Sequence, residues 1–290
     1  MFSRKAPVPA GELADYGDFI SVGGLSIHVW QAGREHTDTI PVILVHGFGA
    51  NNWCWRFMLE GLSARHPVYA PDLPGFGLSD KPEEFDYTLS GYARFMASFM
   101  DTIGIESAVL VGNSMGGGVA ITTALAHRGR VEKLVLIDSI GYDKRGSRVY
   151  RFLGLPVIRD VVTELTSPMM LKLLLKRRVY YDPSLVTEEH VRRFFVAYRT
   201  KNGKRSPLWV YQGFAPFPTI PKEEIEKIDV PTLVVWGQHD KILPVEHAGR
   251  FSRDIASART VIVPNAGHVP HEERPEVVNP LIADFIGGGD

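Results

Sequence analysis

A single serine, Ser114, stands between two glycines at the boundary of two contrasting segments. The segment before it, residues 108–111, is wholly apolar and typical of a buried strand, and residues 117–126 have the small apolar side chains of a tightly packed helix. Gly112 and Gly116 suit a turn so sharp that side chains at those positions would collide. This pattern is that of a nucleophile elbow, in which a strained backbone lifts the serine hydroxyl above the edge of a sheet.

Short apolar runs recur along the chain and are separated by segments of helical length. Near-continuous Val, Ile and Leu runs are typical of strands buried on both faces, which predicts a mostly parallel central sheet flanked by helices. The first two runs alternate around Gly23-Gly24, which predicts an antiparallel hairpin. The predicted strands are 19–22, 25–30, 42–45, 67–70, 108–111, 133–138, 232–236 and 259–263, and the predicted helices lie near 53–63, 88–103, 115–128, 245–252 and 275–286.

The segment between the sixth and seventh predicted strands is too long for one crossover connection. It contains several helical patterns, so we predict a helical cap, or lid, of residues 140–228 inserted into an α/β core of residues 1–139 and 229–290. Residues 141–210 hold 15 of the 32 basic residues and only 6 of the 33 acidic ones. A basic cap on an acidic core accounts for this asymmetry, and a surface that attracts anionic substrates or lipid interfaces is the alternative.

The bulk properties of the chain exclude several classes of protein. Its 290 residues allow one large α/β domain with an insertion, and a net charge of −1 gives no general basis for binding nucleic acid or membranes. No apolar stretch approaches the ~20 residues that cross a bilayer. The single cysteine, Cys54, excludes an internal disulfide and a thiolate metal site. We expect a cytoplasmic protein without integral membrane association, nucleic-acid partner, metal or cofactor, and the oligomeric state stays open.

A serine nucleophile needs a base to take its proton, and the base needs an orienting carboxylate. Asp240 follows the predicted strand 232–236, and His268 follows the predicted strand 259–263. Because parallel strands end at one edge of a sheet, Ser114, Asp240 and His268 are expected on one rim, in the order nucleophile, acid, base. Each acid or base alone is as reasonable as a turn residue or a helix cap. The ordered set is what predicts a catalytic triad.

Three other side chains compete for the acid and base roles. Asp138 also ends a strand and is the candidate acid of a variant arrangement. His271 falls in the turn predicted after His268, and His239 is the neighbour of Asp240, where adjacent loop residues rarely face each other. We rank all three below the ordered set.

The oxyanion of an acyl-transfer intermediate needs two backbone N–H donors near the nucleophile. We expect one from Met115, the residue after Ser114, and the other from Phe48 in the loop His-Gly-Phe-Gly that follows the strand 42–45. Glycines in that loop let the backbone approach the substrate carbonyl, and one such donor is worth about 3 kcal/mol of transition-state stabilisation. We expect His46, at the start of this loop, to anchor it and not to act as a base.

These motifs together resemble those of the α/β-hydrolase fold family, in its group of esterases, lipases and C–C bond hydrolases. The resemblance extends from about residue 20 to residue 286, and only the cap lacks a matching motif. It implies an α/β-hydrolase fold and a structural role, without chemistry, for residues 72–79. The matching residues are His46-Gly47-Phe48-Gly49, Asp72-Leu73-Pro74-Gly75-Phe76-Gly77-Leu78-Ser79, the Ser114 elbow, Gly237-Gln238-His239-Asp240 and Gly267-His268.

A serine at the nucleophile position implies acyl chemistry, because family members that open epoxides or displace halide have aspartate there. We therefore expect a serine carboxylesterase whose small-molecule ester is attacked by Ser114 and released by water activated through His268. The alternative is a C–C bond hydrolase of ring-cleavage products, whose elbow is often similar. In that group a tryptophan commonly follows the histidine, whereas Val269 stands here. A small-molecule receptor of the same fold is the third possibility.

Overall fold

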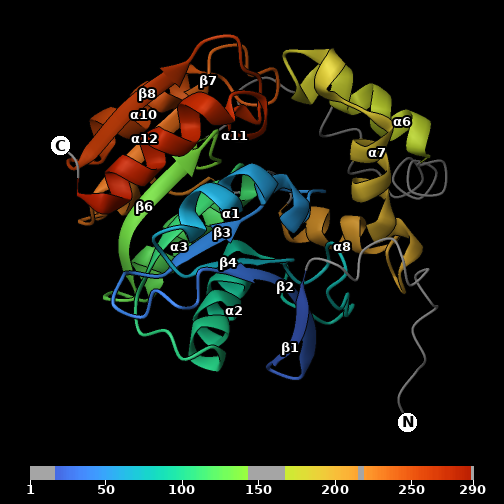
Figure 1. The fold of residues 1–290 in the computed structure, drawn as a ribbon, viewed down its shortest axis with the longest axis horizontal. Coiled ribbons are helices and arrows are strands. Elements are labelled where there is room, and N and C mark those ends of the chain that lie inside the picture. Colours follow the sequence, from blue (N-terminus) through green and yellow to red (C-terminus); the bar gives the residue numbers. More distant parts are fainter. Residues whose placement is uncertain (1–16, 143–166, 215–218, 289–290) are drawn as a thin grey trace.

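The computed structural model describes residues 17–142, 167–214 and 219–288 (Figure 1). Eight strands form one sheet in the spatial order β1-β2-β4-β3-β5-β6-β7-β8. The pairs β1–β2 and β2–β4 are antiparallel, and every other neighbouring pair is parallel, which confirms the predicted sheet and its N-terminal hairpin. The strands are β1 (Asp18–Val22), β2 (Leu25–Ala32), β3 (Val42–Val45), β4 (Val68–Pro71), β5 (Ala108–Asn113), β6 (Val131–Ile137), β7 (Thr232–Gly237) and β8 (Ala258–Val263).

Both faces of the sheet are covered by helices, as Figure 1 shows. Alternate residues of a strand serve opposite faces: Ile43 and Val45 of β3 pack with α2 and α3, whereas Val42 and Leu44 pack with α1 and α12. This double burial explains why the central strands consist mainly of Val, Leu and Ile, whereas the charged residues Glu132 and Lys133 lie near the start of β6 and are not buried. The covering helices are α1 (Arg56–Ser63), which follows a 3₁₀ turn, η1 (Asn52–Trp55), α2 (Leu89–Thr102), α3 (Met115–Ala126), α10 (Glu246–Asp254), α11 (Pro270–Glu273) and α12 (Pro275–Gly287).

Helix α2 illustrates how local sequence sets these elements. The Thr88 side chain accepts a hydrogen bond from the Gly91 N–H at 3.1 Å and caps the helix. Buried residues then recur at helical spacing, with Tyr92, Phe95 and Phe99 facing the core. The predicted helices accordingly agree with the observed ones to within three residues at each end.

Between β6 and β7 the described chain is helical and contributes no strand. Figure 1 shows α6, α7 and α8 grouped at one side of the sheet, apart from the helices that cover its faces. Part of the predicted cap, residues 143–166 and 215–218, lies outside the described residues, and its boundaries at 140 and 228 stay predictions. The elements are α6 (Pro168–Leu174), η2 (Leu175–Val179), η3 (Pro183–Leu185), α7 (Glu188–Phe195), η4 (Val196–Arg199), α8 (Ser206–Gly213) and α9 (Lys222–Ile225).

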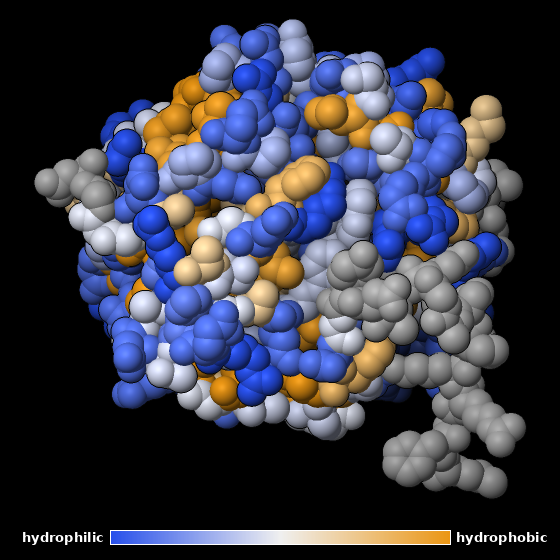
Figure 2. Space-filling model, viewed as in Figure 1, coloured by the Kyte–Doolittle hydropathy of each residue, from blue (hydrophilic) through white to orange (hydrophobic). Residues whose placement is uncertain are grey.

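The surface drawn in Figure 2 is mainly hydrophilic, with small apolar patches between charged side chains. This is the ordinary surface of a globular protein, in which scattered apolar residues need no special explanation. Within the described ranges, we find no helix that combines the length and the apolar character needed to cross a membrane.

Candidate active site

Ser114 lies at the tip of a sharp turn between β5 and α3. Its backbone has φ 55° and ψ −115°, a conformation that costs a residue other than glycine about 1–3 kcal/mol. The turn is also too crowded for side chains at the flanking glycines. A Cβ atom at Gly112 would lie 2.4 Å from the carbonyl oxygen of Gly116, and one at Gly116 would lie 2.0 Å from that of Val45. Strain and crowding together give this turn the geometry of a nucleophile elbow.

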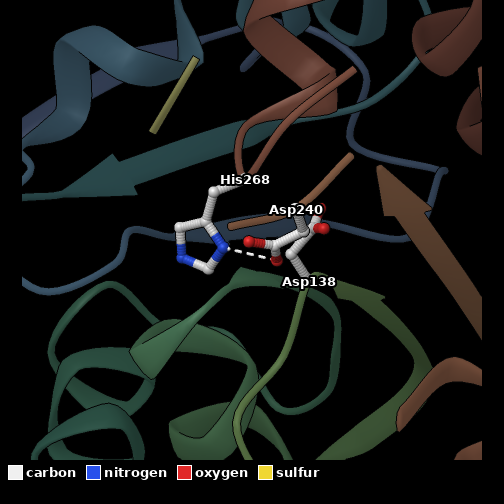
Figure 3. Close-up of side chains that lie close together, drawn as sticks. All are labelled: Asp138, Asp240 and His268. Atoms are coloured by element: carbon white, nitrogen blue, oxygen red, sulfur yellow. Dashed lines mark hydrogen bonds and ion pairs between the residues drawn. The ribbon is translucent and has the colours of Figure 1, made fainter. Parts of the chain in front are cut away.

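Asp240 and His268 meet beyond the carboxyl ends of β7 and β8. His268 Nδ1 lies 2.8 Å from Asp240 Oδ2, and Figure 3 shows the two side chains joined by this hydrogen bond. The other carboxylate oxygen, Oδ1, accepts the N–H groups of Ile242 at 2.7 Å and Leu243 at 3.0 Å. The Asp240 side chain is fully buried. The carboxylate is thus held rigidly, and it orients the imidazole so that Nε2 is free for proton transfer.

The charge state of Asp240 follows from its partners. Burial by itself would raise the pKa of this carboxyl, but the positive potential and hydrogen bond of His268, together with the two loop N–H groups, lower the pKa below its usual value. Asp240 is therefore an anion at neutral pH. An anion in this place stabilises the imidazolium that forms when His268 takes a proton.

The elbow is joined directly to the histidine loop and to the end of β6. Asn113 Nδ2 donates to the backbone carbonyl of His268 at 3.2 Å and to that of Ile137 at 3.1 Å. The Ser114 N–H donates to the same Ile137 carbonyl at 2.9 Å. The structure thus places Ser114, Asp240 and His268 at one rim of the sheet, where the sequence predicts them, and their catalytic roles stay predictions.

The loop after β3 passes against the elbow. A Cβ atom at Gly47 would lie 3.1 Å from the Cβ of Ser114. His46 fixes this loop, because its Nδ1 donates to the Gly47 carbonyl at 2.8 Å and its Nε2 accepts the Leu73 N–H at 3.0 Å. Burial lowers the pKa of His46, so it stays neutral and has no nitrogen left to act as a base.

The expected oxyanion donors lie on either side of this contact. Met115 is the first residue of α3, and the first N–H groups of a helix have no acceptor within the helix. Phe48 belongs to the loop after β3, and its ring packs edge-on against Phe76 at 5.7 Å between centroids. Two N–H groups from these positions suit an oxyanion that forms at Ser114, and that role remains a prediction.

Asp138, the competing acid, also lies at this rim. Its backbone has φ 43°, its side chain is buried, and its Oδ1 accepts the Gly237 N–H at 3.0 Å. One ligand atom each of Asp138, Asp240 and His268 lies within 4.8 Å of the other two. Figure 3 shows the three side chains close together. Of the two carboxyl groups, Asp240 is the one hydrogen-bonded to His268. A cluster of this kind has donor atoms that a cation could use, and the expectation of no metal stays a prediction.

The other two histidines serve different purposes. His271 lies in α11, where the sequence predicts a turn, and its ring packs against Trp55 at 4.5 Å between centroids. Burial lowers the pKa of His271 to about 3, so it is a neutral core residue. His239 is exposed, and its ring stacks on that of Tyr181, with 4.4 Å between the centroids. Tyr181 belongs to the segment inserted between β6 and β7. Neither ring is hydrogen-bonded to Asp240 in the described chain.

Glu273 also lies at this rim, although its sequence context does not predict it there. Its Oε1 accepts the N–H of Gly267 at 2.6 Å, and its Oε2 accepts the N–H groups of residues 181–182 at 2.7 and 3.1 Å. The His268 N–H in turn donates to the carbonyl of Val179 at 2.8 Å. The inserted segment is therefore hydrogen-bonded to the histidine loop. The sequence around Glu273 does not indicate these contacts, because the residues at 181–182 that it binds lie about 90 positions earlier in the chain.

A second contact between the insertion and the core is formed by Arg56. Its guanidinium lies 2.5 Å from Glu272 Oε2 and 3.0 Å from His190 Nε2 of α7, and it stacks 3.7 Å above the Trp53 ring. Burial and the adjacent Arg56 charge lower the pKa of His190 to about 4. His190 is therefore neutral at pH 7 and accepts a hydrogen bond from the guanidinium.

Comparison with known proteins finds one family model, that of the alpha/beta hydrolase fold, over residues 40–275. The 2-hydroxy-6-oxo-6-(2'-aminophenyl)hexa-2,4-dienoic acid hydrolase of Metapseudomonas resinovorans is 30% identical over 269 residues, which cover 89% of this chain and 86% of that protein. A meta-cleavage product hydrolase from Pseudomonas fluorescens is structurally similar, with a TM-score of 0.80, 27% identity and coverage of 95% and 99%. A bacterial membrane phospholipase A gives a TM-score of 0.77, 27% identity and coverage of 94% and 86%.

Proposed function

Because this chain belongs to the alpha/beta hydrolase fold family, we propose that it is a serine hydrolase that cleaves carboxylic esters through an acyl-enzyme intermediate. The observation that carries the proposal is the strained elbow serine, Ser114, on the same rim as the hydrogen-bonded Asp240–His268 pair. Family members that open epoxides have an aspartate nucleophile, and the serine here favours attack on an acyl carbon.

In the first half of the reaction, Ser114 Oγ attacks the ester carbonyl while His268 Nε2 takes the hydroxyl proton. The negative charge that develops on the carbonyl oxygen is stabilised by the N–H groups of Met115 and Phe48, which contribute about 3 kcal/mol each. His268 then returns the proton to the leaving alcohol. The ester C–O bond breaks and the acyl group stays on Ser114.

In the second half, water replaces the alcohol. His268 takes a proton from the water, the resulting hydroxide attacks the acyl carbon, and the acid leaves as Ser114 recovers its proton. Asp240 remains ionised throughout and stabilises the imidazolium twice per cycle. The rigid hold on Asp240 by two backbone N–H groups keeps the imidazole in one orientation during both halves.

Hydrolysis of a C–C bond is the second candidate, and the relatives favour it. The Metapseudomonas relative acts on a hexadienoic acid, and the Pseudomonas structure is that of a meta-cleavage product hydrolase. The basic inserted segment suits an acidic substrate of this kind. Against it stands Val269, where that group commonly has tryptophan. The phospholipase similarity favours the ester.

Turnover of two substrate classes by one preparation tests both candidates. The purified protein is assayed with p-nitrophenyl esters of increasing acyl length and with a dienone-type acid, alongside Ser114→Ala. The proposal expects ester cleavage that depends on Ser114, together with a burst of p-nitrophenol that reports the acyl-enzyme. Cleavage of the dienone acid alone selects the C–C hydrolase. Binding of small molecules without turnover of either class selects the receptor.

A further inference from the structure

The surroundings of the Asp138 carboxyl group do not stabilise a negative charge. It is fully buried, and its Oδ2 atom receives no hydrogen bond from any described residue. Oδ1 receives a single one, from the Gly237 N–H at 3.0 Å. A buried carboxylate normally accepts several hydrogen bonds or pairs with a cation, because an unsatisfied buried charge costs several kcal/mol.

The groups that face Asp138 come from three other elements. They are Asp240 from the loop after β7, His268 from the loop after β8 and Glu273 of α11. Because the imidazole Nδ1 already donates to Asp240, the Asp240 carboxylate is the group that is left to pair with Asp138. Figure 3 shows the carboxyl groups of Asp138 and Asp240 side by side. Two carboxyl groups this close to each other share a site only when one of them keeps its proton.

Asp240 is the member of the pair that stays ionised. Its Oδ1 already accepts two N–H groups, and its Oδ2 accepts only the His268 nitrogen. An oxygen of this type has a second lone pair, so Oδ2 can accept one hydrogen bond more. Burial, and after it the charge of Asp240, raise the pKa of Asp138 well above its usual value, in agreement with this division.

We propose that Asp138 is a positioning residue, a neutral carboxylic acid that lies behind Asp240 and donates a hydrogen bond to the Asp240 carboxylate. The inference rests on the proposed function of the Asp240–His268 pair. Its benefit is electrostatic. A second full negative charge beside His268 would hold the imidazole in its protonated form, and a protonated imidazole cannot accept the proton of Ser114. A neutral donor orients Asp240 and adds no charge.

Two substitutions at this position separate the roles of shape, hydrogen bonding and charge. Asn at 138 can accept the Gly237 N–H with its oxygen and donate to Asp240 with its nitrogen, whereas Leu fills similar space with neither function. We expect Asp138→Leu to lower kcat/KM by about tenfold or more, since it removes a hydrogen bond to a charged group. Asp138→Asn should recover most of that loss. A merely structural role predicts no such difference between folded Asn and Leu variants.

The pH profile of kcat/KM decides the charge of Asp138. If Asp138 is neutral, Asp138→Asn changes no charge and leaves the acid limb of the profile where it is in the wild type. If Asp138 is ionised, Asp138→Asn removes a negative charge beside His268 and moves that limb to lower pH by roughly one unit. The second result would overturn the proposal. Asp86→Asn, which changes an exposed aspartate, is the matched control and should leave the profile unchanged.

Infrared spectroscopy tests the same proton without any substrate. At pH 7 the wild type should show the C=O stretch of a buried carboxylic acid, which Asp138→Asn removes and Asp86→Asn retains. Absence of that band from the wild type refutes the proposal even if the substitution at 138 impairs folding. If the band is present but the protein cleaves no ester, Asp138 is protonated as proposed and the proposed function is wrong. The failure of one proposal can therefore be told from the failure of the other.

Discussion

Asp72 and Asp138 each follow a strand of the sheet directly and are buried, yet their pKa values are shifted in opposite directions. The Asp72 carboxylate accepts the Asn52 N–H at 2.7 Å and the Leu78 N–H at 2.8 Å, and it lies 3.0 Å from His28 Nδ1. These donors and the nearby histidine lower the pKa of Asp72 although burial opposes them. Asp138 has one N–H donor and a carboxylate neighbour, and its pKa is raised.

Since the two residues are of the same type and both follow a strand, the hydrogen-bond donors around a buried carboxyl group decide its charge. At the end of β4, the ionised Asp72 holds together three segments, from β2, from the turn before α1 and from the loop 72–79. At the ends of β6 to β8, one ligand atom each of Asp138, Asp240 and His268 lies within 4.8 Å of the other two. We therefore expect one half of the rim to serve stability and the other half to serve chemistry.

The largest expected effect is the loss of activity when the predicted nucleophile is removed. Ser114→Ala should lower kcat for p-nitrophenyl esters by a factor on the order of 10⁴ or more, because it removes the nucleophile. The free energy of unfolding in urea should stay close to that of the wild type.

Ser79→Ala is the matched change near Asp72, where Ser79 Oγ accepts the His28 N–H and donates to the Asp72 carbonyl. It should lower stability by about 1–2 kcal/mol and spare kcat. Equal kcat values for Ser114→Ala and Ser79→Ala would show that the two parts of the rim do not differ in their importance for catalysis.

Asp72→Asn should have the largest effect on stability. Removal of a buried charge from its partners typically costs about 3–5 kcal/mol, and urea denaturation measures the loss. The kcat of the folded fraction should change little. Asp86→Asn breaks an exposed pair with Arg94 and should cost about 0–1 kcal/mol. A comparable loss in the two variants would show that the donors around Asp72 add little.

Glu273→Gln should have an intermediate effect, and this effect should be seen in both stability and kcat/KM. The amide retains one acceptor oxygen and loses the charge that now receives the N–H groups of Gly267 and residues 181–182. We expect about 1–3 kcal/mol less stability and a lower kcat/KM, because the histidine loop and the inserted segment are held less firmly. Glu276→Gln, an exposed change on α12, should alter neither quantity. A change in stability without a change in kcat/KM would limit Glu273 to a structural role.

The smallest expected effect is a difference in the pH dependence of stability. A carboxyl with a lowered pKa, such as Asp72, stabilises the fold above the unfolded pKa of about 4, and that contribution disappears as the pH falls through the folded value. Asp138 has a raised pKa, so its contribution is complete below about pH 4 and is lost as the pH rises through the folded value. Each tenfold change in proton affinity is worth about 1.4 kcal/mol.

Urea titrations from acid to alkaline pH check these opposite signs. Asp72→Asn should flatten the acid side of the stability profile, and Asp138→Asn should flatten its alkaline side. The same slope in both variants would mean that the two aspartates carry the same charge.

Much of the fold follows from local sequence. The alternation around Gly23-Gly24, the apolar runs of the parallel strands and the glycines of the elbow each depend on short-range sterics and on period-two burial, which a sequence displays directly. Asp240 and His268 are predicted at one rim for the same reason, because each follows a strand whose carboxyl end lies at the common edge.

The pairing of distant polar groups cannot be found in this way. Glu273 follows the predicted turn after His268, and only the folded chain brings its carboxylate back to Gly267 and across to the inserted segment. The core positions of His271 and His190 depend likewise on which elements pack against them. Hydrogen bonds between segments that lie far apart in the sequence have no signature within either segment.

Local sequence is enough to predict the order and type of the elements, the elbow serine, and the acid and base that follow strands at the same rim. Only the folded chain shows that the Asp138 carboxyl lies beside the Asp240–His268 pair, and that Glu273 connects the segment between β6 and β7 to the histidine loop. The physical reason is that backbone geometry and burial are set locally by chemical type. The charge of a buried carboxyl is set by the donors around it, and those come from every part of the chain.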